Sequence, residues 1–395
     1  MRGRTPTTAP ATAGEIFRLV RDGEAGTRTE IGRATGLSRT AVAARVDRLL
    51  AEGLVTEVVG AAATGGRPAA RLVFHATGGT VLALPIGVSR TKAAICDLTG
   101  EVIAEDVLDQ PASVGPEKLI AAAIPVLERL LATAGAAESG IRGIGVSIPG
   151  TVDSGSGSSI GVPALPGWEG VPLPPLLSGR FPVPVRVDND VNVMALAEHA
   201  AHPGVDDLLM VKVSTGVGAG VVSGGRLQRG AWGAAGEIGH TPVHDGPGVG
   251  CGCGNVDCLE VLASGAALVR DLADAGRDVH GVGDVITLVK QGDPDAVRLV
   301  RTAGRRLGEV LAAAVNLINP AVVTIGGDLV GAYDPLVAGV REAIYRQSMA
   351  AATQDLRIEP GLMSGRSGVT GCAILVLDEV LAPAAVDAAL SDPDV

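Results

Sequence analysis

The sequence has few of the features that mark secreted or membrane proteins. It contains only five cysteines, and three of them are clustered, which argues against a disulfide scaffold and favours a reducing compartment, the cytoplasm. The first 14 residues include two arginines but no apolar stretch, so we expect no secretory signal. The most apolar stretch, residues 310–327, is interrupted by Asn316, Asn319 and Pro320, whereas a helix that crosses a bilayer needs about 20 apolar residues. We therefore expect neither a membrane segment nor a membrane partner.

Lysine is absent from the first 75 residues, and the charge of the chain reverses after them. These residues contain 11 arginines and 7 acidic residues, a net charge of +4, while the rest of the chain has a net charge of −15. A basic head on an acidic body is typical of a DNA-binding module attached to another domain. A solvated, arginine-rich surface would give the same charges. The length of 395 residues and a hydrophobic content of 47% allow two or three domains with large cores.

The first 75 residues predict a winged helix-turn-helix. Two capping boxes, Thr12 with Glu15 and Thr27 with Glu30, each predict the start of a helix, because their side chains accept hydrogen bonds from free backbone N–H groups of the first turn. A turn follows at residues 36–38, where a glycine can adopt a positive φ and a serine can cap the next helix.

A third helix, expected from residue 39 to about residue 52, has the pattern of a recognition helix. Its apolar positions face the core, while arginine, threonine and alanine point outward near its start, where such helices meet base edges. Strand-like runs at 54–59 and 71–74 predict a hairpin wing whose tip carries an arginine suited to phosphate or a minor groove. The same elements would also suit a three-helix protein-interaction module. The residues predicted to contact DNA are Ser38, Arg39, Thr40, Ala43, Arg45 and Arg67.

Three cysteines and a histidine predict a metal site in a glycine-rich part of the body. Cys251, Cys253 and Cys258 lie within eight residues, and a closed set of three thiolates and one imidazole is a structural zinc site. In a reducing compartment, cysteines with such spacing bind metal more often than they form a metal-free buried group. His240 and His244 are both candidates for the fourth ligand.

From residue 80 onward, apolar β-branched runs alternate with helical segments, which predicts an α/β domain. Asp293-Pro294 combines a capping side chain with proline at the first helical position and predicts the start of a long helix. Strands are expected at 81–86, 91–97, 141–148, 183–187, 208–214, 218–222 and 321–325, and helices at 117–134, 191–199 and 294–318.

Several motifs of this body resemble the ROK family, which joins bacterial repressors and sugar kinases. The most specific are Gly236-Glu237-Ile238-Gly239-His240 and the run from Cys251 to Glu260, which match the family's GE-x-GH and cysteine signatures. Further similar segments are Pro149-Gly150 with Val152-Asp153, Leu165-Pro166-Gly167-Trp168, Asp188-Asn189-Asp190-Val191-Asn192 and, in the wing, Gly65-Gly66-Arg67-Pro68.

The resemblance covers nearly the whole chain and implies an actin-like, hexokinase-type, two-lobed α/β domain preceded by the helix-turn-helix domain. The DNA-binding domain would span residues 1–76 and the sugar-binding body residues 77–395. Lobe 1 would comprise about 77–190 plus a C-terminal helix at about 370–390, and lobe 2 about 191–369.

The resemblance also implies which residues bind metal and sugar. His240 belongs to the GE-x-GH motif, so it is preferred to His244 as the fourth zinc ligand. A sugar would lie between the lobes, with its hydroxyls bound by polar side chains and with zinc bracing the pocket. Taken singly, these residues could have surface or capping roles, as Asp188 and Asp190 could at the start of the following helix. The implied sugar-binding residues are Asn189, Asp190, Glu237, His240 and Glu260.

The family's kinases carry an Asp-x-Gly-x-Thr loop that handles phosphate and magnesium, and this chain departs from it. Pro85 replaces the aspartate and Ser89 the threonine, and proline offers neither a carboxylate for hydrated magnesium nor a backbone N–H. Asp190, which matches the kinase base, is retained and would serve as a hydroxyl acceptor. Phosphoryl transfer depends on positioning and charge stabilisation, so we expect a sensor and no efficient enzyme.

These observations predict a sugar-responsive transcriptional regulator, acting as a repressor. Its partners would be a palindromic operator and a sugar or sugar phosphate, its cofactor structural Zn²⁺, and its assembly a homodimer or homotetramer. The alternative is an ATP-dependent sugar kinase with an attached DNA-binding head. A scaffold with two vestigial sites is a third reading, and it predicts no ligand and no specific operator.

Overall fold

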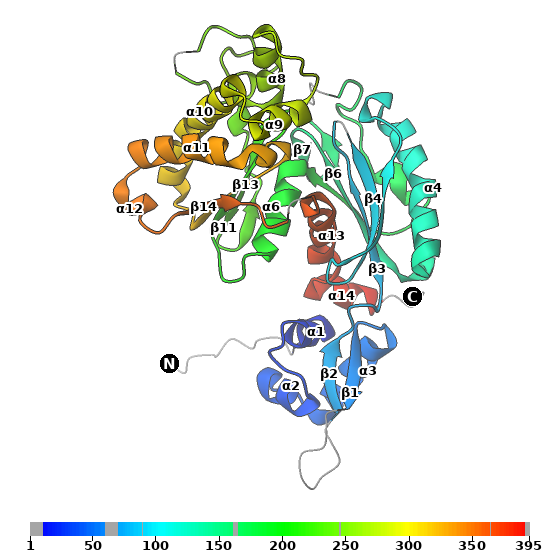
Figure 1. The fold of residues 1–395 in the computed structure, drawn as a ribbon. Coiled ribbons are helices and arrows are strands. Elements are labelled where there is room, and N and C mark those ends of the chain that lie inside the picture. The colour runs from blue at the N-terminus through cyan, green and yellow to red at the C-terminus, as the bar shows by residue number, and fades with distance from the viewer. Residues whose placement is uncertain are drawn as a thin grey trace.

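The chain folds into a small head, made of helices and a hairpin, and a larger α/β body with two lobes (Figure 1). The computed structural model describes residues 11–59, 70–88, 90–160, 165–244, 246–363 and 365–391. This is the fold class predicted from the sequence, and the head and the body follow one another in the predicted order.

The head contains three helices and a two-stranded antiparallel sheet. Both capping boxes form, with Thr12 and Thr27 as the N-caps, and Gly36 ends the second helix in the left-handed conformation with φ 71°. The predicted wing arginine, Arg67, lies outside the described residues. The elements of the head are α1 (Ala13–Arg21), α2 (Arg28–Thr35), α3 (Arg39–Ala51), β1 (Val55–Val59) and β2 (Ala70–Phe74).

Lobe 1 is built on a five-stranded mixed sheet with the strand order β5-β4-β3-β6-β9. The strands are rich in buried Val, Ile, Leu and Ala because both faces of the sheet are covered by helices. The elements of lobe 1 are β3 (Thr80–Pro85), β4 (Thr91–Asp97), β5 (Val102–Leu108), α4 (Pro116–Ala134), β6 (Ile141–Ile148), β7 (Val152–Asp153), β8 (Ser158–Ser159), α5 (Pro174–Ser178) and β9 (Val185–Asn189).

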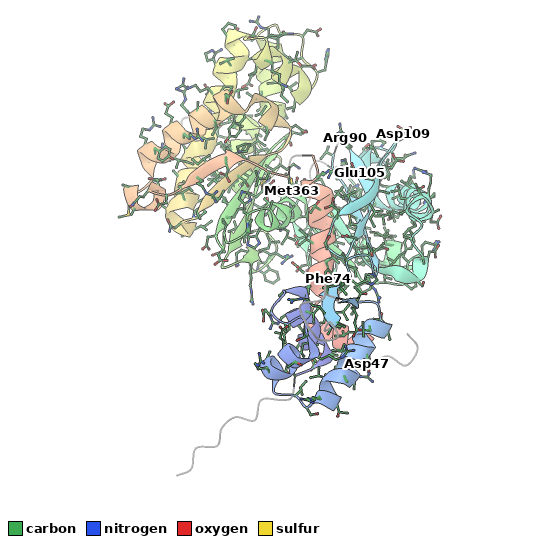
Figure 2. All side chains as sticks on the ribbon, turned by 60° about the horizontal axis from the view of Figure 1, so that its bottom comes forward. Asp47, Phe74, Arg90, Glu105, Asp109 and Met363 are labelled. Atoms are coloured by element: carbon green, nitrogen blue, oxygen red, sulfur yellow. The ribbon has the colours of Figure 1, made fainter. Side chains whose placement is uncertain are left out.

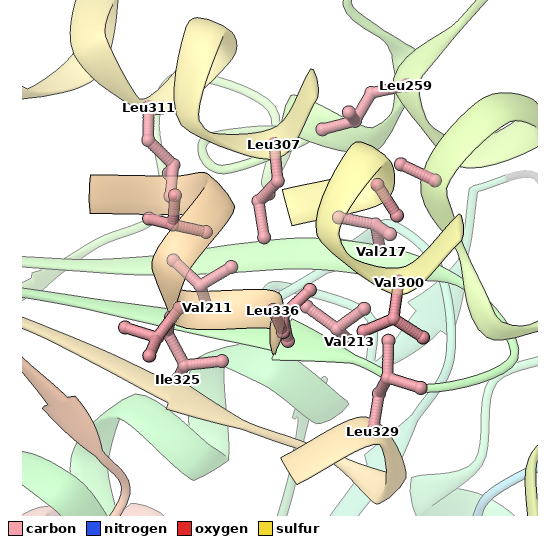
Figure 3. Packing of buried hydrophobic residues seen from close by; sticks show 14 of the residues in the cluster. Val211, Val213, Val217, Leu259, Val300, Leu307, Leu311, Ile325, Leu329 and Leu336 are labelled. Carbon is pink, nitrogen blue, oxygen red and sulfur yellow. The ribbon is translucent and has the colours of Figure 1, made fainter. Parts of the chain in front are cut away.

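Lobe 2 has a second five-stranded sheet, in the order β12-β11-β10-β13-β14. Its core lies where the long helix α10 packs on the central strands, and Figure 3 shows Leu307 and Leu311 of that helix above Val211 and Ile325. The elements of lobe 2 are β10 (Leu208–Val213), β11 (Val217–Ser223), β12 (Arg226–Gln228), α7 (Leu259–Ala263), α8 (Gly265–Asp274), α9 (Val282–Lys290), α10 (Pro294–Ile318), β13 (Val322–Gly326), α11 (Tyr333–Gln347), α12 (Ala350–Thr353) and β14 (Arg357–Pro360).

Three further helices link the lobes and the head. Helix α6 (Asp190–Ala200) packs on α13 (Ser367–Val380), and α14 (Pro383–Ala389) packs on α1 of the head. The single C-terminal helix expected at about 370–390 is therefore two helices, because Leu381 ends the first and Pro383 starts the second. Strand β9 lies two residues later than expected. Asn189 caps α6, a role that Asp188 and Asp190 could also have had.

Among the described residues, no single helix has the length and apolar content of a membrane span, although α13 and α14 reach these values as a pair that bends by 67°.

Candidate functional site

The four predicted metal ligands meet at one point of lobe 2. The ligand atoms of His240, Cys251, Cys253 and Cys258 all lie within 4.8 Å of one another. Cys251 Sγ is 3.5 Å from His240 Nδ1, and Cys253 Sγ is 3.6 Å from Cys258 Sγ. Around tetrahedral zinc, with Zn–S bonds of about 2.3 Å, neighbouring ligand atoms are about 3.5–3.8 Å apart. The group therefore fits a zinc ion, whereas His244 is exposed and lies outside it.

The thiols of this group differ in their acidity. The backbone N–H of Asn255 lowers the pKa of Cys253 to about 7, because a donated hydrogen bond stabilises the thiolate. Burial raises the pKa of Cys258 to about 12, because a thiolate loses its hydration there. A cation bound among the sulfurs would compensate for that loss, so a closed donor set of this kind is suited to holding a metal.

The metal ligands adjoin two of the predicted sugar-binding carboxylates. His240 ends the short 3₁₀ turn Ile238–His240, which directly follows Glu237, and Cys258 is the N-cap of α7, which carries Glu260. The backbone N–H of Leu259 donates to the carbonyl of Thr241 at 2.9 Å and ties the two segments together. An ion held here would fix both carboxylates relative to lobe 2.

Glu237 reaches across to lobe 1, whereas Glu260 stays within lobe 2. The hydroxyl of Thr151 donates to Glu237 Oε1 at 2.9 Å, and this bond joins the segment after β6 to lobe 2. The backbone N–H of Val217 donates to Glu260 Oε2 at 3.2 Å. Both carboxylates keep further oxygen lone pairs for a ligand.

Asn189 lies on the lobe 1 side of the same seam. Its amide Nδ2 donates to the carbonyl of Gly150 at 2.9 Å, and its Oδ1 accepts from the N–H groups of Val191 and Asn192. Asn189 contacts Gly150 and Glu237 contacts Thr151, so the two side chains bind consecutive residues of lobe 1. We call the contacts of Asn189, Gly150, Thr151 and Glu237 the interlobe seam.

Asp190 has a partner that sequence reasoning missed. Lys212 of β10 forms an ion pair with Asp190 Oδ2, and both side chains are largely buried. The only sequence signal was a lysine among apolar residues of a strand, and nothing in the sequence pairs it with Asp190. The pair occupies one oxygen of the residue that matches the kinase base.

One cavity of the structure lies close to the predicted sugar-binding residues. It has a volume of about 310 Å³, and Asp188 and Arg229 are among its lining residues, whereas Glu237 and Glu260 are not. The five residues expected to bind sugar are arranged around the interlobe seam and the metal ligands, outside this cavity.

Pro85, at the position of the missing kinase aspartate, is half-buried and packs against the start of α13. Gly368, at the start of α13, is so close to Pro85 that a Cβ added to the glycine would lie 3.2 Å from the Cβ of Pro85. Ser89, the second departure from the kinase loop, lies outside the described residues.

The head presents the predicted recognition helix at its surface. Ser38 caps α3, and its Oγ accepts from the N–H of Ala41 at 3.2 Å. Arg39 and Thr40 are exposed. Ala43 and Arg45 are half-buried, and the Arg45 guanidinium donates to the carbonyl of Ala41. Figure 2 shows Asp47, also on α3, and Phe74 closer to the body.

Two exposed arginines of the head were missed by the sequence prediction. Arg33 on α2 and Arg48 on α3 form no ion pair with the residues that the structure describes, and neither does Arg39. By contrast, Arg28 is paired with Asp47 and Glu57. Unpaired guanidinium groups remain available for phosphate. The exposure of these arginines in the structure identifies them as candidates for DNA contact.

Comparison with known proteins gave matches to both parts of the chain. A model described as winged helix-turn-helix DNA-binding matches residues 18–56, and a model described as the ROK family matches residues 81–379. A xylose repressor of Caldicellulosiruptor bescii is 29% identical over 381 residues, which cover 93% of this chain and 95% of the relative.

Two solved structures are also similar to this chain. A ROK family transcriptional regulator, described as a homologue of the Escherichia coli MLC protein, has a TM-score of 0.81 and 27% identity, and the match covers 96% of this chain and 98% of that one. A ROK hexokinase from Thermus thermophilus has a TM-score of 0.62 and 32% identity, covering 75% of this chain and 97% of that one. The regulator thus matches nearly the full chain, while the hexokinase leaves a quarter of it unmatched.

Proposed function

This chain belongs to the ROK family, and from that premise we propose that it is a sugar-responsive transcriptional repressor with a zinc-braced sugar site. The observation that carries the proposal is the combination of a DNA-binding head with the metal-ligand group beside Glu237 and Glu260. The xylose repressor that matches 93% of this chain supports the same function. The metal would supply structural bracing alone, since its four protein ligands leave no open position.

The proposed sugar ligands act from both sides of the interlobe seam. In this proposal, vicinal hydroxyls of the sugar replace the bond between Thr151 and Glu237 and engage Glu237 together with Glu260. Asn189 and Asp190 contribute from the start of α6. A ligand that binds one arrangement of the lobes better than the other shifts the balance between the arrangements by that difference in affinity.

The head is attached firmly enough to lobe 1 to follow such a shift. Arg142, in β6, forms an ion pair with Glu52, the C-cap residue of the recognition helix, and also donates to its carbonyl oxygen at 2.8 Å. The N–H of Gly14 donates to Asp387 Oδ1 of α14 at 2.8 Å. One continuous apolar cluster joins the head to α13 and α14. We infer that the head and lobe 1 move as one body.

The proposed domains follow the predicted bounds, with the DNA-binding domain in residues 1–76 and the body in residues 77–395. We also propose that the operator is palindromic and that the protein is a homodimer or homotetramer, because a two-fold symmetric operator requires two heads. Ser38, Arg39, Thr40, Ala43, Arg45 and Arg67 are the proposed DNA-contacting residues.

The second candidate function, a sugar kinase with a DNA-binding head, is favoured by the similarity to the Thermus hexokinase. Three features of this chain speak against efficient phosphoryl transfer. Pro85 lacks a carboxylate for magnesium, Gly368 packs against it, and Lys212 occupies one oxygen of Asp190. We propose the repressor on these grounds.

The test begins by selecting preferred sites from random DNA and measuring their affinity with and without a panel of sugars and sugar phosphates. One sugar is expected to weaken operator binding by about 5- to 150-fold, the usual range of coupling between two sites. Arg39→Ala is expected to weaken operator binding more than binding to random DNA, whereas the matched control Arg129→Ala, at an exposed position of α4 in lobe 1, leaves both unchanged.

Two results would contradict the proposal. One is the absence of any sugar that changes operator affinity, and the other is sugar-dependent ADP release at ordinary kinase rates, of about 1–100 per second.

A further inference from the structure

A short loop of lobe 2 carries an unusually exposed tryptophan beside the interlobe seam. Trp232 is 81% exposed, although the chain has only two tryptophans and seven aromatic residues in all. The other tryptophan, Trp168, is 1% exposed, and its indole N–H donates to the carbonyl of Ala112 at 2.9 Å. Trp232 therefore contributes little to packing, and its apolar surface is available to a ligand.

The loop that carries Trp232 is held in place by several contacts. Arg229 Nε donates to Asp188 Oδ2 at 2.6 Å, and the N–H of Ala235 donates to the carbonyl of Arg229 at 3.1 Å. Gly233, with φ 77°, is so close to lobe 1 that an added Cβ would lie 2.2 Å from the carbonyl oxygen of Val152. The indole thus projects from a fixed loop that touches both lobes.

The sequence around Trp232 leaves its ring unscreened. The tip of the loop reads Gly230-Ala231-Trp232-Gly233-Ala234, so no long or charged side chain on this segment covers the indole. Both faces of the ring are free of long neighbours on the loop, which suits stacking against a flat apolar surface.

A second exposed apolar side chain lies next to the same lobe 1 segment. Ile160 is 48% exposed, and its N–H donates to the carbonyl of Thr151 at 2.8 Å. Thr151 in turn donates its hydroxyl to Glu237. Ile160 and the loop of Trp232 therefore both contact the Thr151–Val152 segment, next to a proposed sugar ligand. We call these two side chains the apolar rim.

We propose that the apolar rim is a second saccharide subsite and that the effector is a glycoside of at least two rings. This rests on the proposed sugar site, in which the first ring engages Glu237 and Glu260. The C–H face of a pyranose ring is apolar, and binding sites combine such flat contacts with a few placed polar groups. Trp232 is exposed on a loop that contacts Val152, next to Thr151 and its partner Glu237, so in this proposal it meets the part of the ligand that leaves the seam. In a disaccharide, that part is the second ring.

The test compares matched pairs of probes by isothermal titration: xylose with xylobiose, N-acetylglucosamine with chitobiose, and glucose with cellobiose and maltose. One disaccharide is expected to bind at least about tenfold more tightly than its monosaccharide, a gain of about 1.4 kcal/mol. Trp232→Ala and Ile160→Ala should reduce the ratio of disaccharide affinity to monosaccharide affinity toward one. Both variants should keep the monosaccharide affinity within about twofold of that of the unchanged protein. Trp232→Phe should retain part of the ratio.

Tryptophan fluorescence provides an independent signal. Because Trp168 is buried, disaccharide binding should shift the emission of Trp232 to shorter wavelength, and the shift should be absent in Trp232→Ala. Equal affinities for mono- and disaccharides would overturn the second subsite while leaving the sugar sensor intact. A Trp232→Ala variant that alters only the oligomeric state, with the ratio unchanged, would also overturn it and identify the rim as a protein contact. If no sugar of either size bound, the proposed function itself would fail.

Discussion

At the scale of single residues, the metal-ligand group shows how few atoms hold the candidate site together. His240 is three residues after Glu237, and Cys258 is two residues before Glu260. A group of four ligand atoms within 4.8 Å therefore limits the positions of both carboxylates. A metal held by this group would add to the backbone hydrogen bonds of the segment, such as that from Leu259 to Thr241, in orienting both carboxylates.

The two histidines of this region allow a matched test of the metal site. His240→Ala is expected to lose bound zinc, because it removes one of four ligands, while His244→Ala, at an exposed position outside the group, should keep about one zinc per chain. Zinc content is measured by mass spectrometry of the purified protein. Equal zinc content in the two variants would mean that His240 is not a ligand.

The pairing of Lys212 with Asp190 shows a limit of motif matching at this scale. Asp190 matches the position of the kinase base, yet one of its carboxylate oxygens contacts an ammonium group. A retained aspartate therefore does not indicate a retained function, because its charge partner decides which proton or hydroxyl it can accept.

At the scale of elements, strand β6 connects the DNA-binding head with the candidate site. Arg142, near its start, holds the end of the recognition helix through Glu52. Beyond its other end, Gly150 and Thr151 form the lobe 1 side of the interlobe seam. Strand β6 therefore lies between the contacts of the two sites, and we propose that it couples them.

Breaking the Arg142 contact should weaken this connection. Arg142→Ala leaves Glu52 largely buried without its partner, so the free energy of unfolding should fall by about 1–3 kcal/mol. The sugar-induced change in operator affinity should also become smaller. Denaturant unfolding and operator titration measure the two effects, and Arg129→Ala, which breaks an exposed pair with Asp106, is the control. An unchanged sugar response would exclude Arg142 from the coupling.

Helices α6 and α13 pack so closely that only glycine fits between them. A Cβ on Gly371 would lie 1.9 Å from the carbonyl oxygen of Val193 in α6. Gly371→Ala should therefore separate the helices and lower the free energy of unfolding by about 1–3 kcal/mol. Gly283→Ala on α9, where an added Cβ meets open space, should change it by less than about 1 kcal/mol. Urea unfolding of both variants gives the comparison, and similar values would show that α6 can move aside freely.

At the scale of the whole molecule, the head is attached to lobe 1 by several contacts. Its apolar core is continuous with that of α13 and α14, and Arg142 of lobe 1 is paired with Glu52 of the head. The repressor proposal requires this arrangement, because a head on a loose tether would not register a change between the lobes.

Distances between site-specific labels would test this arrangement directly. Spin labels would be attached to unnatural amino acids that replace Glu24 in the head, Arg129 in lobe 1 and Arg298 in lobe 2. Sugar binding should change the distance between the labels on the head and on lobe 2. The head-to-lobe 1 distance should stay constant, because Arg142 and α14 hold the head. A head that moved relative to lobe 1 while both lobes kept their separation would contradict the proposed coupling.

Much of this protein was readable from its sequence because the signals are local. Capping boxes at Thr12 and Thr27, Pro294 after a capping aspartate, and the cysteine spacing each depend on residues within a few positions of one another. The family motifs added the two-lobed fold, which neither composition nor periodicity contains. Hydrogen bonding within one turn of a helix is decided by neighbours in the chain, so such features survive without tertiary information.

Contacts between distant segments were decided only by the tertiary structure. The pairing of Lys212 with Asp190 and the contact of Arg142 with Glu52 join residues that are far apart in the sequence. So do the contacts that the Trp232 loop and Ile160 make with the Thr151–Val152 segment. The sequence determined which chemical groups the protein has and, at Thr12, Thr27 and Asp293, where helices begin. Packing determined which groups face each other, because partners brought together by folding leave no spacing pattern along the chain.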